Sequence, residues 1–171
     1  MLYARLLDTC GQLYGDSDLT GKAAKLRATI LDMSMTESGF FCDNALRQDG
    51  KLVLSGERTE SCQYYAFFCD IVTPESHPWL WETLLHDFGY DRATRGLYPE
   101  IYPANAFIGN YLRLDLLDRY GCREALYDNI KATLPTWRTR PARCGRTWVT
   151  TPPATTGSPR TCCTGWIILD C

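Results

Sequence analysis

The stretch YPEIYPANAFIGNYLRLDLLDRY, residues 98–120, decides the fold. Its first half is aromatic and polar, and Pro99 and Pro103 interrupt it. Its second half has large apolar residues at helical spacing: Phe107, Ile108, Tyr111, Leu112, Leu114 and Leu117. This pattern predicts a rigid loop that runs directly into a buried helix. Loops held by rigid elements often carry binding groups, so we expect this loop to form one wall of a binding site.

Toward the N-terminus, two helical patterns follow each other closely. Residues 2–14 have apolar side chains on one helical face, and Gly15 is expected to end this helix. Asp16 or Asp18 can cap a second helix, whose apolar residues between positions 19 and 33 recur at helical spacing. The short connection predicts that the two helices form an antiparallel hairpin.

The pattern changes between residues 39 and 56. There Asp49-Gly50 separates two short apolar runs, which is a β-hairpin signal. Thr59 can then cap a third helix that ends at Pro74, and further helices are expected at 77–88 and 123–133. The sequence therefore predicts an all-α protein built from helical hairpins, with a small β-hairpin excursion near residues 40–55.

Composition excludes several classes of function. The chain has 171 residues, enough for one domain with a core, and a formal charge of −2. This charge does not suggest a nucleic-acid or anionic-membrane partner. No apolar run approaches the roughly 18 residues of a membrane span, and the N-terminal residues lack the features of a signal peptide.

The nine cysteines and two histidines do not form a metal-binding pattern. No pair of cysteines has the CxxC spacing of a zinc site, and His77 and His86 are too few to complete one. We expect free thiols in a reducing cytoplasm, with no metal and no cofactor.

The segment 134–171 differs from the rest of the chain. It contains five of the nine prolines and four of the nine cysteines, but only one acidic residue, Asp170, of the chain's 20. This composition is expected of an irregular, disordered tail. When residues 136–148 are written as codons with free third positions and read one nucleotide earlier, the string YMADKTGTLWEN fits, and it suits the preceding helices better. We therefore expect a frameshift near Thr133, and a domain that covers residues 1–133.

Three strings before this tail resemble a known family: TESCQYYAFFCDIVTPE (59–75), LLHDFGYDR (84–92) and YPEIYPANAFIGNYLRLDLLDRYG (98–121). They are similar to the C-terminal half of the catalytic domain of bacterial α-L-rhamnosidase-like glycoside hydrolases. MLYARLLDTCGQLYGD and FFCDNALRQDGKLVLSGERTE match the same region. The resemblance implies a partial (α/α)6 barrel of the six-hairpin glycosidases, a rhamnose-type sugar as ligand, and an upstream part of the barrel that is missing here.

The resemblance also implies inverting hydrolysis by two carboxyl groups, one acid and one base. It places the acid upstream of Met1, and the base in a TLWE-type motif that occurs only in the alternative frame, over residues 144–147. Each such group typically contributes about 10²–10⁴-fold in rate, so the isolated chain is expected to be inactive.

Glu60 is the remaining acidic candidate for catalysis. It follows Thr59 in the first turn of the expected third helix. Three roles stay open: a helix-capping acid favoured by the helix dipole, a contact to a sugar hydroxyl, or catalysis.

The loop supplies the other candidates for sugar binding. Tyr98, Tyr102 and Phe107 could stack on a sugar face or pack in the core. Glu100 could bind a sugar hydroxyl or pair with an arginine, and Asn105 could cap the following helix or contact the ligand.

The sequence thus favours a fragment of a glycosidase that cleaves terminal α-L-rhamnosides. The alternatives are a non-catalytic helical module that binds carbohydrate or another partner, and another six-hairpin activity. Half a barrel would leave apolar helix faces without partners, so we also expect exposed apolar surface and self-association.

Overall fold

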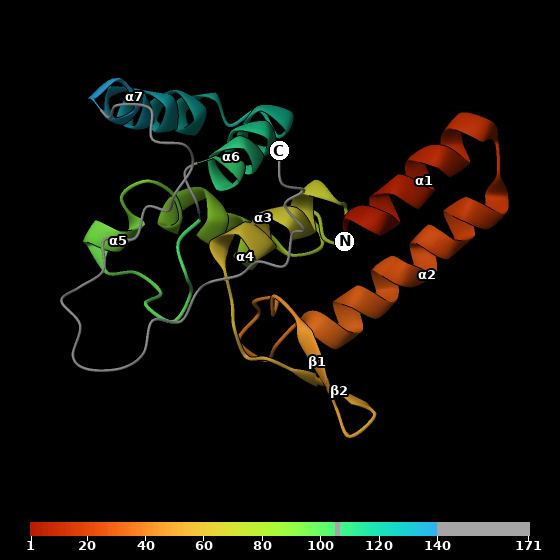
Figure 1. Ribbon diagram of the computed structural model, residues 1–171. Coiled ribbons are helices and arrows are strands. Elements are labelled where there is room, and N and C mark those ends of the chain that lie inside the picture. Colours follow the sequence, from red (N-terminus) through yellow and green to blue (C-terminus); the bar gives the residue numbers. More distant parts are fainter. Residues whose placement is uncertain (105–106, 140–171) are drawn as a thin grey trace, which may run out of the picture.

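The computed structural model of the protein describes residues 1–104 and 107–139. These residues are mostly helical and include a two-stranded antiparallel sheet (Figure 1), so the expected helical class is confirmed. The elements, in chain order, are α1 (Leu2–Tyr14), α2 (Ser17–Ser34), β1 (Ala45–Gln48), β2 (Lys51–Leu54), α3 (Glu60–Phe68), α4 (Pro78–Glu82), the π-helical turn η1 (Thr83–Asp87), α5 (Arg92–Arg95), α6 (Ile108–Arg119) and α7 (Arg123–Thr139).

Helices α1 and α2 form the expected antiparallel hairpin, which projects from the rest of the molecule (Figure 1). Gly15 ends α1 in the left-handed conformation, with φ of 66°. Asp16 caps α2 by accepting hydrogen bonds from the backbone N–H groups of Asp18 and Leu19 at 2.9 and 3.2 Å. The local signals in the sequence are therefore sufficient to explain both ends of the turn.

Helix α2 lies close against α1 at Gly11. A Cβ atom added there would lie 2.6 Å from the Thr20 side chain and 2.9 Å from the Asp16 carbonyl oxygen. A Cβ atom added at Gly21, on α2, would have no other atom within 4 Å. Gly11 is therefore a contact glycine, whereas Gly21 has no steric requirement.

Strands β1 and β2 form the predicted β-hairpin around Asp49 and Gly50. Both turn residues have positive φ, 48° and 80°, as a tight two-residue connection requires. All residues of the two strands are exposed, because the hairpin does not lie against the core.

The core is an aromatic cluster around α3. Its largest fully buried side chains include Tyr64 and Phe67 of α3 and Leu112 and Leu116 of α6, and helices α3 and α6 pack against each other. The segment before the β-hairpin contributes Phe41, whose backbone N–H donates to the Gln63 side-chain oxygen at 2.8 Å. This core fixes α3 in the centre of the molecule.

Helix α3 differs from the expected amphipathic helix in two ways. It is buried over more than a narrow stripe, since Gln63, Tyr64 and Phe67 are fully buried, while Tyr65 is only half-buried. It also ends at Phe68, well before Pro74, because Asp70 adopts φ of 56° and reverses the chain.

Two further helix boundaries differ from the expectation. The single helix expected at 77–88 is α4 followed by the π-helical turn η1. Helix α7 continues to Thr139, beyond the composition change after Thr133. The expected frameshifted tail otherwise lies outside the described residues, as does Asn105.

No helix within the described ranges combines the length and apolarity that crossing a membrane would require.

Substitution by alanine should have opposite effects at Gly11 and Gly21, the glycines inside the two helices of the hairpin. Gly21→Ala should stabilise the fold by about 0.5–1 kcal/mol, because alanine restricts the unfolded chain and favours helix. Gly11→Ala should destabilise it by about 1–3 kcal/mol, because the methyl group has no space against α2. Urea unfolding of both variants, followed by circular dichroism, measures the difference. Equal stabilisation by both substitutions would contradict the close contact at Gly11.

Candidate functional site

The loop that the sequence singled out runs from Leu97 to Ala104 and lies beside the N-terminus of α3. The Glu60 backbone N–H donates to the Tyr102 carbonyl oxygen at 2.9 Å, and the Tyr102 N–H donates to the Arg58 carbonyl oxygen at 2.9 Å. These bonds form a single parallel bridge between Thr59 and Tyr102. The loop is thus attached to the helix by its backbone.

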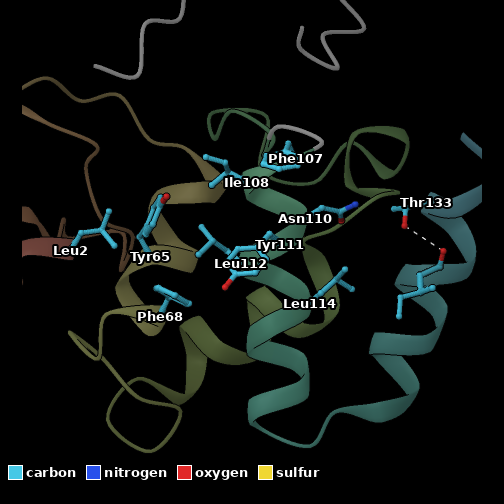
Figure 2. A pocket seen from close by; sticks show the side chains of 11 residues that line it. Leu2, Tyr65, Phe68, Phe107, Ile108, Asn110, Tyr111, Leu112, Leu114 and Thr133 are labelled. Carbon is cyan, nitrogen blue, oxygen red and sulfur yellow. Dashed lines mark hydrogen bonds between the residues drawn. The ribbon is translucent and has the colours of Figure 1, made fainter. Parts of the chain in front are cut away.

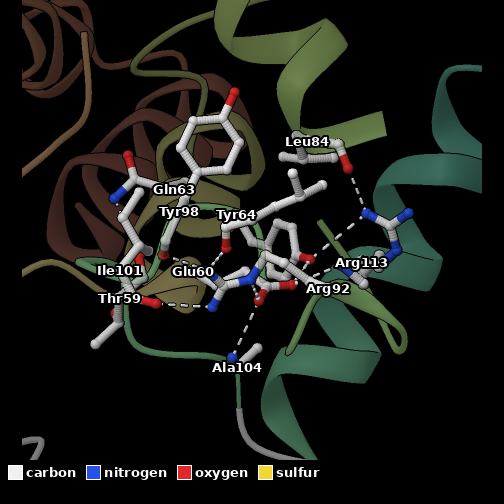
Figure 3. A network of polar contacts seen from close by, with 12 residues as sticks. Thr59, Glu60, Gln63, Tyr64, Leu84, Arg92, Tyr98, Ile101, Ala104 and Arg113 are labelled. Carbon is white, nitrogen blue, oxygen red and sulfur yellow. Dashed lines mark hydrogen bonds and ion pairs between the residues drawn. The ribbon is translucent and has the colours of Figure 1, made fainter. Parts of the chain in front are cut away.

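Glu60 holds the loop through its side chain as well. The residue is only 2% exposed, and four donors surround its carboxylate (Figure 3). Oε1 accepts from the Tyr64 hydroxyl and from the Gly89 N–H at 3.1 Å. Oε2 accepts from Arg92 Nε at 3.1 Å and from the Ala104 N–H at 3.3 Å. The carboxylate therefore joins α3 to three separate segments of the chain.

Arg92 binds the other side of the same loop. Its Nη1 donates to the carbonyl oxygens of Leu97 and Tyr98 at 3.2 and 2.9 Å. Its Nη2 donates to the carbonyl oxygen of Ile101 at 2.8 Å. The planar guanidinium also lies over the Phe88 ring, 5.2 Å from its centroid. A single buried arginine thus satisfies three loop carbonyls and the charge of Glu60.

Arg113 of α6 extends the network to the π-helical turn. It donates to the carbonyl oxygens of Leu84 and Leu85 and to the Asn129 side-chain oxygen. It also donates to the Tyr64 hydroxyl at 3.5 Å. The π-helical winding of η1 is thereby supported by a side chain from a different helix.

The Tyr64 hydroxyl contacts both Glu60, which pairs with Arg92, and Arg113. Burial raises the pKa of the Tyr64 phenol well above its ordinary value, and the Glu60 carboxylate acts in the same direction. The phenol therefore stays protonated, and its hydroxyl donates a hydrogen bond to the Glu60 carboxylate. Gly89 completes the arrangement: its φ of 118° favours glycine, and a Cβ atom there would lie 3.1 Å from the Arg113 guanidinium.

Among the candidate sugar contacts, Glu60 and Tyr98 have internal partners. The four donors occupy the Glu60 carboxylate and burial separates it from solvent, which leaves no position for a ligand. The Tyr98 ring packs against Phe40 and Phe88, with centroids 5.4 and 5.8 Å apart, and its hydroxyl donates to Asp87. Both residues hold the loop rather than face outward.

Tyr102, Glu100 and Phe107 do reach solvent. Tyr102 is 57% exposed, on the same loop as the exposed Glu100. Within the part of the chain that the structure describes, Glu100 forms no ion pair. Phe107 is 72% exposed and lies at the start of α6, where it lines a different feature, an apolar groove.

This groove has a volume of about 720 Å³ and lies between α3, α6 and α7, with Leu2 of α1 at one end (Figure 2). Its lining is Leu2, Tyr65, Phe68, Phe107, Ile108, Asn110, Tyr111, Leu112, Leu114, Ile130 and Thr133. None of these residues is charged, so the groove offers no carboxyl group for acid–base chemistry. Among residues 1–104 and 107–139 there is also no cluster of side chains able to hold a metal ion.

Two tryptophans and a histidine outside the loop take no part in this network. Trp79 is about half exposed, and Trp81 is buried against Phe67 and Tyr120. His86 is largely exposed and lies 3.2 Å from Glu82.

Sequence reasoning did not identify Arg92, Arg113 or Tyr64. Arg92 and Arg113 lie 32 and 53 positions after Glu60, so no local spacing relates them to it. Arg113 lies between Leu112 and Leu114, which was a weak signal of burial, whereas Arg92 lies among polar residues and gave none.

Comparison with protein-family models, with curated proteins and with solved structures gives no significant match for this chain. The glycosidase resemblance therefore stays a prediction from the residues quoted above.

Breaking the Glu60–Arg92 pair should destabilise the fold strongly. Glu60→Gln leaves Arg92 buried without its counter-charge and places an amide donor opposite existing donors, at an expected cost of about 3–5 kcal/mol. Glu82→Gln removes an exposed carboxylate that is paired with His86, and should cost under about 0.5 kcal/mol. Urea denaturation measures both. A cost below about 1 kcal/mol for Glu60→Gln would show that the ion pair does not hold the loop.

Asp43 should give the fold a measurable pH dependence. Its Oδ1 accepts from the Thr59 N–H and hydroxyl at 2.9 and 3.0 Å, but burial dominates and raises the pKa of its carboxyl above the ordinary value. The folded state thus favours the protonated acid. This contribution is complete below the unfolded pKa, about 3.9, and is lost as pH rises through the folded pKa.

Asp43→Asn removes this titration, while its side-chain oxygen can still accept from Thr59. Relative to the variant, the unmodified protein should lose stability between about pH 4 and the raised pKa of Asp43. Urea unfolding across this range measures the difference. Parallel stability curves for the two proteins would contradict the raised pKa.

Proposed function

We propose that the chain is part of an α-L-rhamnosidase-like glycoside hydrolase, in which the loop from Leu97 to Ala104 contributes to recognition of a sugar. In this proposal the chain has no hydrolytic activity of its own and uses no cofactor. Its helical hairpins correspond to part of an (α/α)6 barrel, and its free cysteines fit a cytoplasmic location.

The observation that carries the proposal is the way in which this loop is held. Glu60 and Arg92 bind it from the buried side, while Tyr102 and Glu100 remain exposed on it. An aromatic face and a carboxylate on a fixed backbone are suited to a sugar ring and its hydroxyl groups. Because the loop is already ordered, little conformational entropy would be lost on binding.

The geometry supports recognition better than catalysis. Glycoside hydrolysis needs two carboxyl groups on either side of the scissile bond. Glu60, the acidic residue that the sequence favoured, has its carboxylate buried among four donors. The apolar groove contributes no acid. These facts also favour the second candidate, a helical carbohydrate-binding module without catalytic activity.

Isothermal titration of the full chain with L-rhamnose tests recognition by the loop. Tyr102→Ala should weaken binding roughly fivefold, because an aromatic contact contributes about 1 kcal/mol. Tyr90→Ala is a matched control: Tyr90 is also 57% exposed but lies outside the loop. Absence of binding by the unmodified chain, or equal loss in both variants, would argue against a sugar site at this loop.

Release of p-nitrophenol from p-nitrophenyl α-L-rhamnoside should stay at the background rate. The same assay on a protein that combines this chain with the expected upstream and alternative-frame segments separates the two candidates. Activity of that longer protein supports the glycosidase, whereas sugar binding without turnover supports the non-catalytic module.

A further inference from the structure

Helix α1 exposes three leucines on one side. Leu2, Leu6 and Leu13 lie within about 40° of one another around the helix, at 100° per residue. They are 37%, 56% and 73% exposed. Tyr3 and Tyr14 extend the same surface and are also exposed. We call Leu2, Leu6 and Leu13 the α1 stripe.

The α1 stripe begins where the apolar groove ends. Leu2 belongs to both, because it closes one end of the groove beside Tyr65 (Figure 2). From Leu2, α1 runs away from α6 and α7, which form the opposite end of the groove (Figure 1). The α1 stripe and the groove are thus both apolar, and they lie on either side of Leu2.

Neither surface has a charged side chain without a partner. The charged residues of α1 are Arg5 and Asp8, and both are used within the chain. Arg5 lies against the Phe68 ring and Asp70, and Asp8 accepts from Arg27 at 3.0 Å. The groove is lined only by uncharged residues. Two copies can therefore bring stripe and groove together without burying an unpaired charge or opposing like charges.

We propose that two copies of this chain form a two-fold dimer in which the α1 stripe of each occupies the groove of the other. A two-fold axis near Leu2 carries α1 of one copy over the groove of its partner, and the reverse contact follows from symmetry. The arrangement is closed, so it ends at two copies.

The size of the two surfaces is compatible with a weak but specific dimer. Helix α1 has 13 residues. Such a helix is about 20 Å long and 10 Å wide, so half of its circumference offers roughly 300 Å². Each contact buries about this area on the helix and a similar area on the groove, and the dimer has two such contacts. The total is roughly 1,200 Å², the lower end of the range for specific interfaces. We expect a dissociation constant in the micromolar range.

Sedimentation velocity on the full chain up to roughly 100 μM tests the dimer, since this concentration exceeds a micromolar dissociation constant. The unmodified chain should shift from monomer to dimer with concentration. Leu13→Glu should weaken association at least about tenfold by placing a charge in the contact. Gln12→Glu is the control. Gln12 is exposed and lies about 100° around α1 from Leu13, so the same charge at this position should leave association unchanged.

Tyr111→Lys tests the groove. Tyr111 is exposed, and the substitution adds a charge to the lining without removing a core side chain. It should also weaken association, and circular dichroism checks that both variants remain folded. An equimolar mixture of Leu13→Glu and Tyr111→Lys chains keeps one intact stripe-and-groove contact, so it should form more dimer than either variant alone.

Other results would overturn the proposal. A monomer at every concentration would exclude the dimer. Full association of Tyr111→Lys would mean that α1 pairs with another surface, such as α1 of a second copy. Assemblies that grow beyond two copies, or a mixture that behaves as the average of its components, would exclude the reciprocal two-fold contact.

Discussion

The ion pair between Glu60 and Arg92 is the constraint on which the central part of the structure depends. Both groups are nearly inaccessible to water, so each needs the other and a full set of hydrogen bonds. Those bonds come from the segments at Gly89, 97–101 and 104. The position of α3 therefore determines the course of two connections with little regular structure of their own: the one between η1 and α5, and the loop from Leu97 to Ala104.

This use of charge explains how a loop of irregular backbone can be well placed without a sheet or a long helix. Tyr98 has φ of 48°, which is unusual for a residue with a side chain, and Arg92 binds its carbonyl oxygen. The polar groups inside the protein hold this backbone, whereas Tyr102 and Glu100 are presented outward. Such a division is typical of a binding surface, and it keeps the most buried carboxylate away from any ligand.

The remainder of the molecule has more apolar surface than its core can cover. Helices α1 and α2 pack mainly on each other, and Arg5 and Arg27 tie them to the end of α3 through the carbonyl oxygens of Phe68 and Cys69. Leu6 and Leu13 are left exposed beside a groove that is also apolar. Surfaces of this kind are typical of contacts with further protein, either another segment or another copy.

The sequence by itself determined the local structure: Gly15 and Asp16 at the first turn, Asp49-Gly50 in the β-hairpin, and Thr59 as the cap of α3. Each depends on the conformational preference or hydrogen bonding of residues close in the chain. The roles of Glu60, Arg92 and Arg113 were decided only by the tertiary structure. A buried charge is recognised by its partners, and these partners lie tens of residues apart, where periodicity and capping rules carry no information.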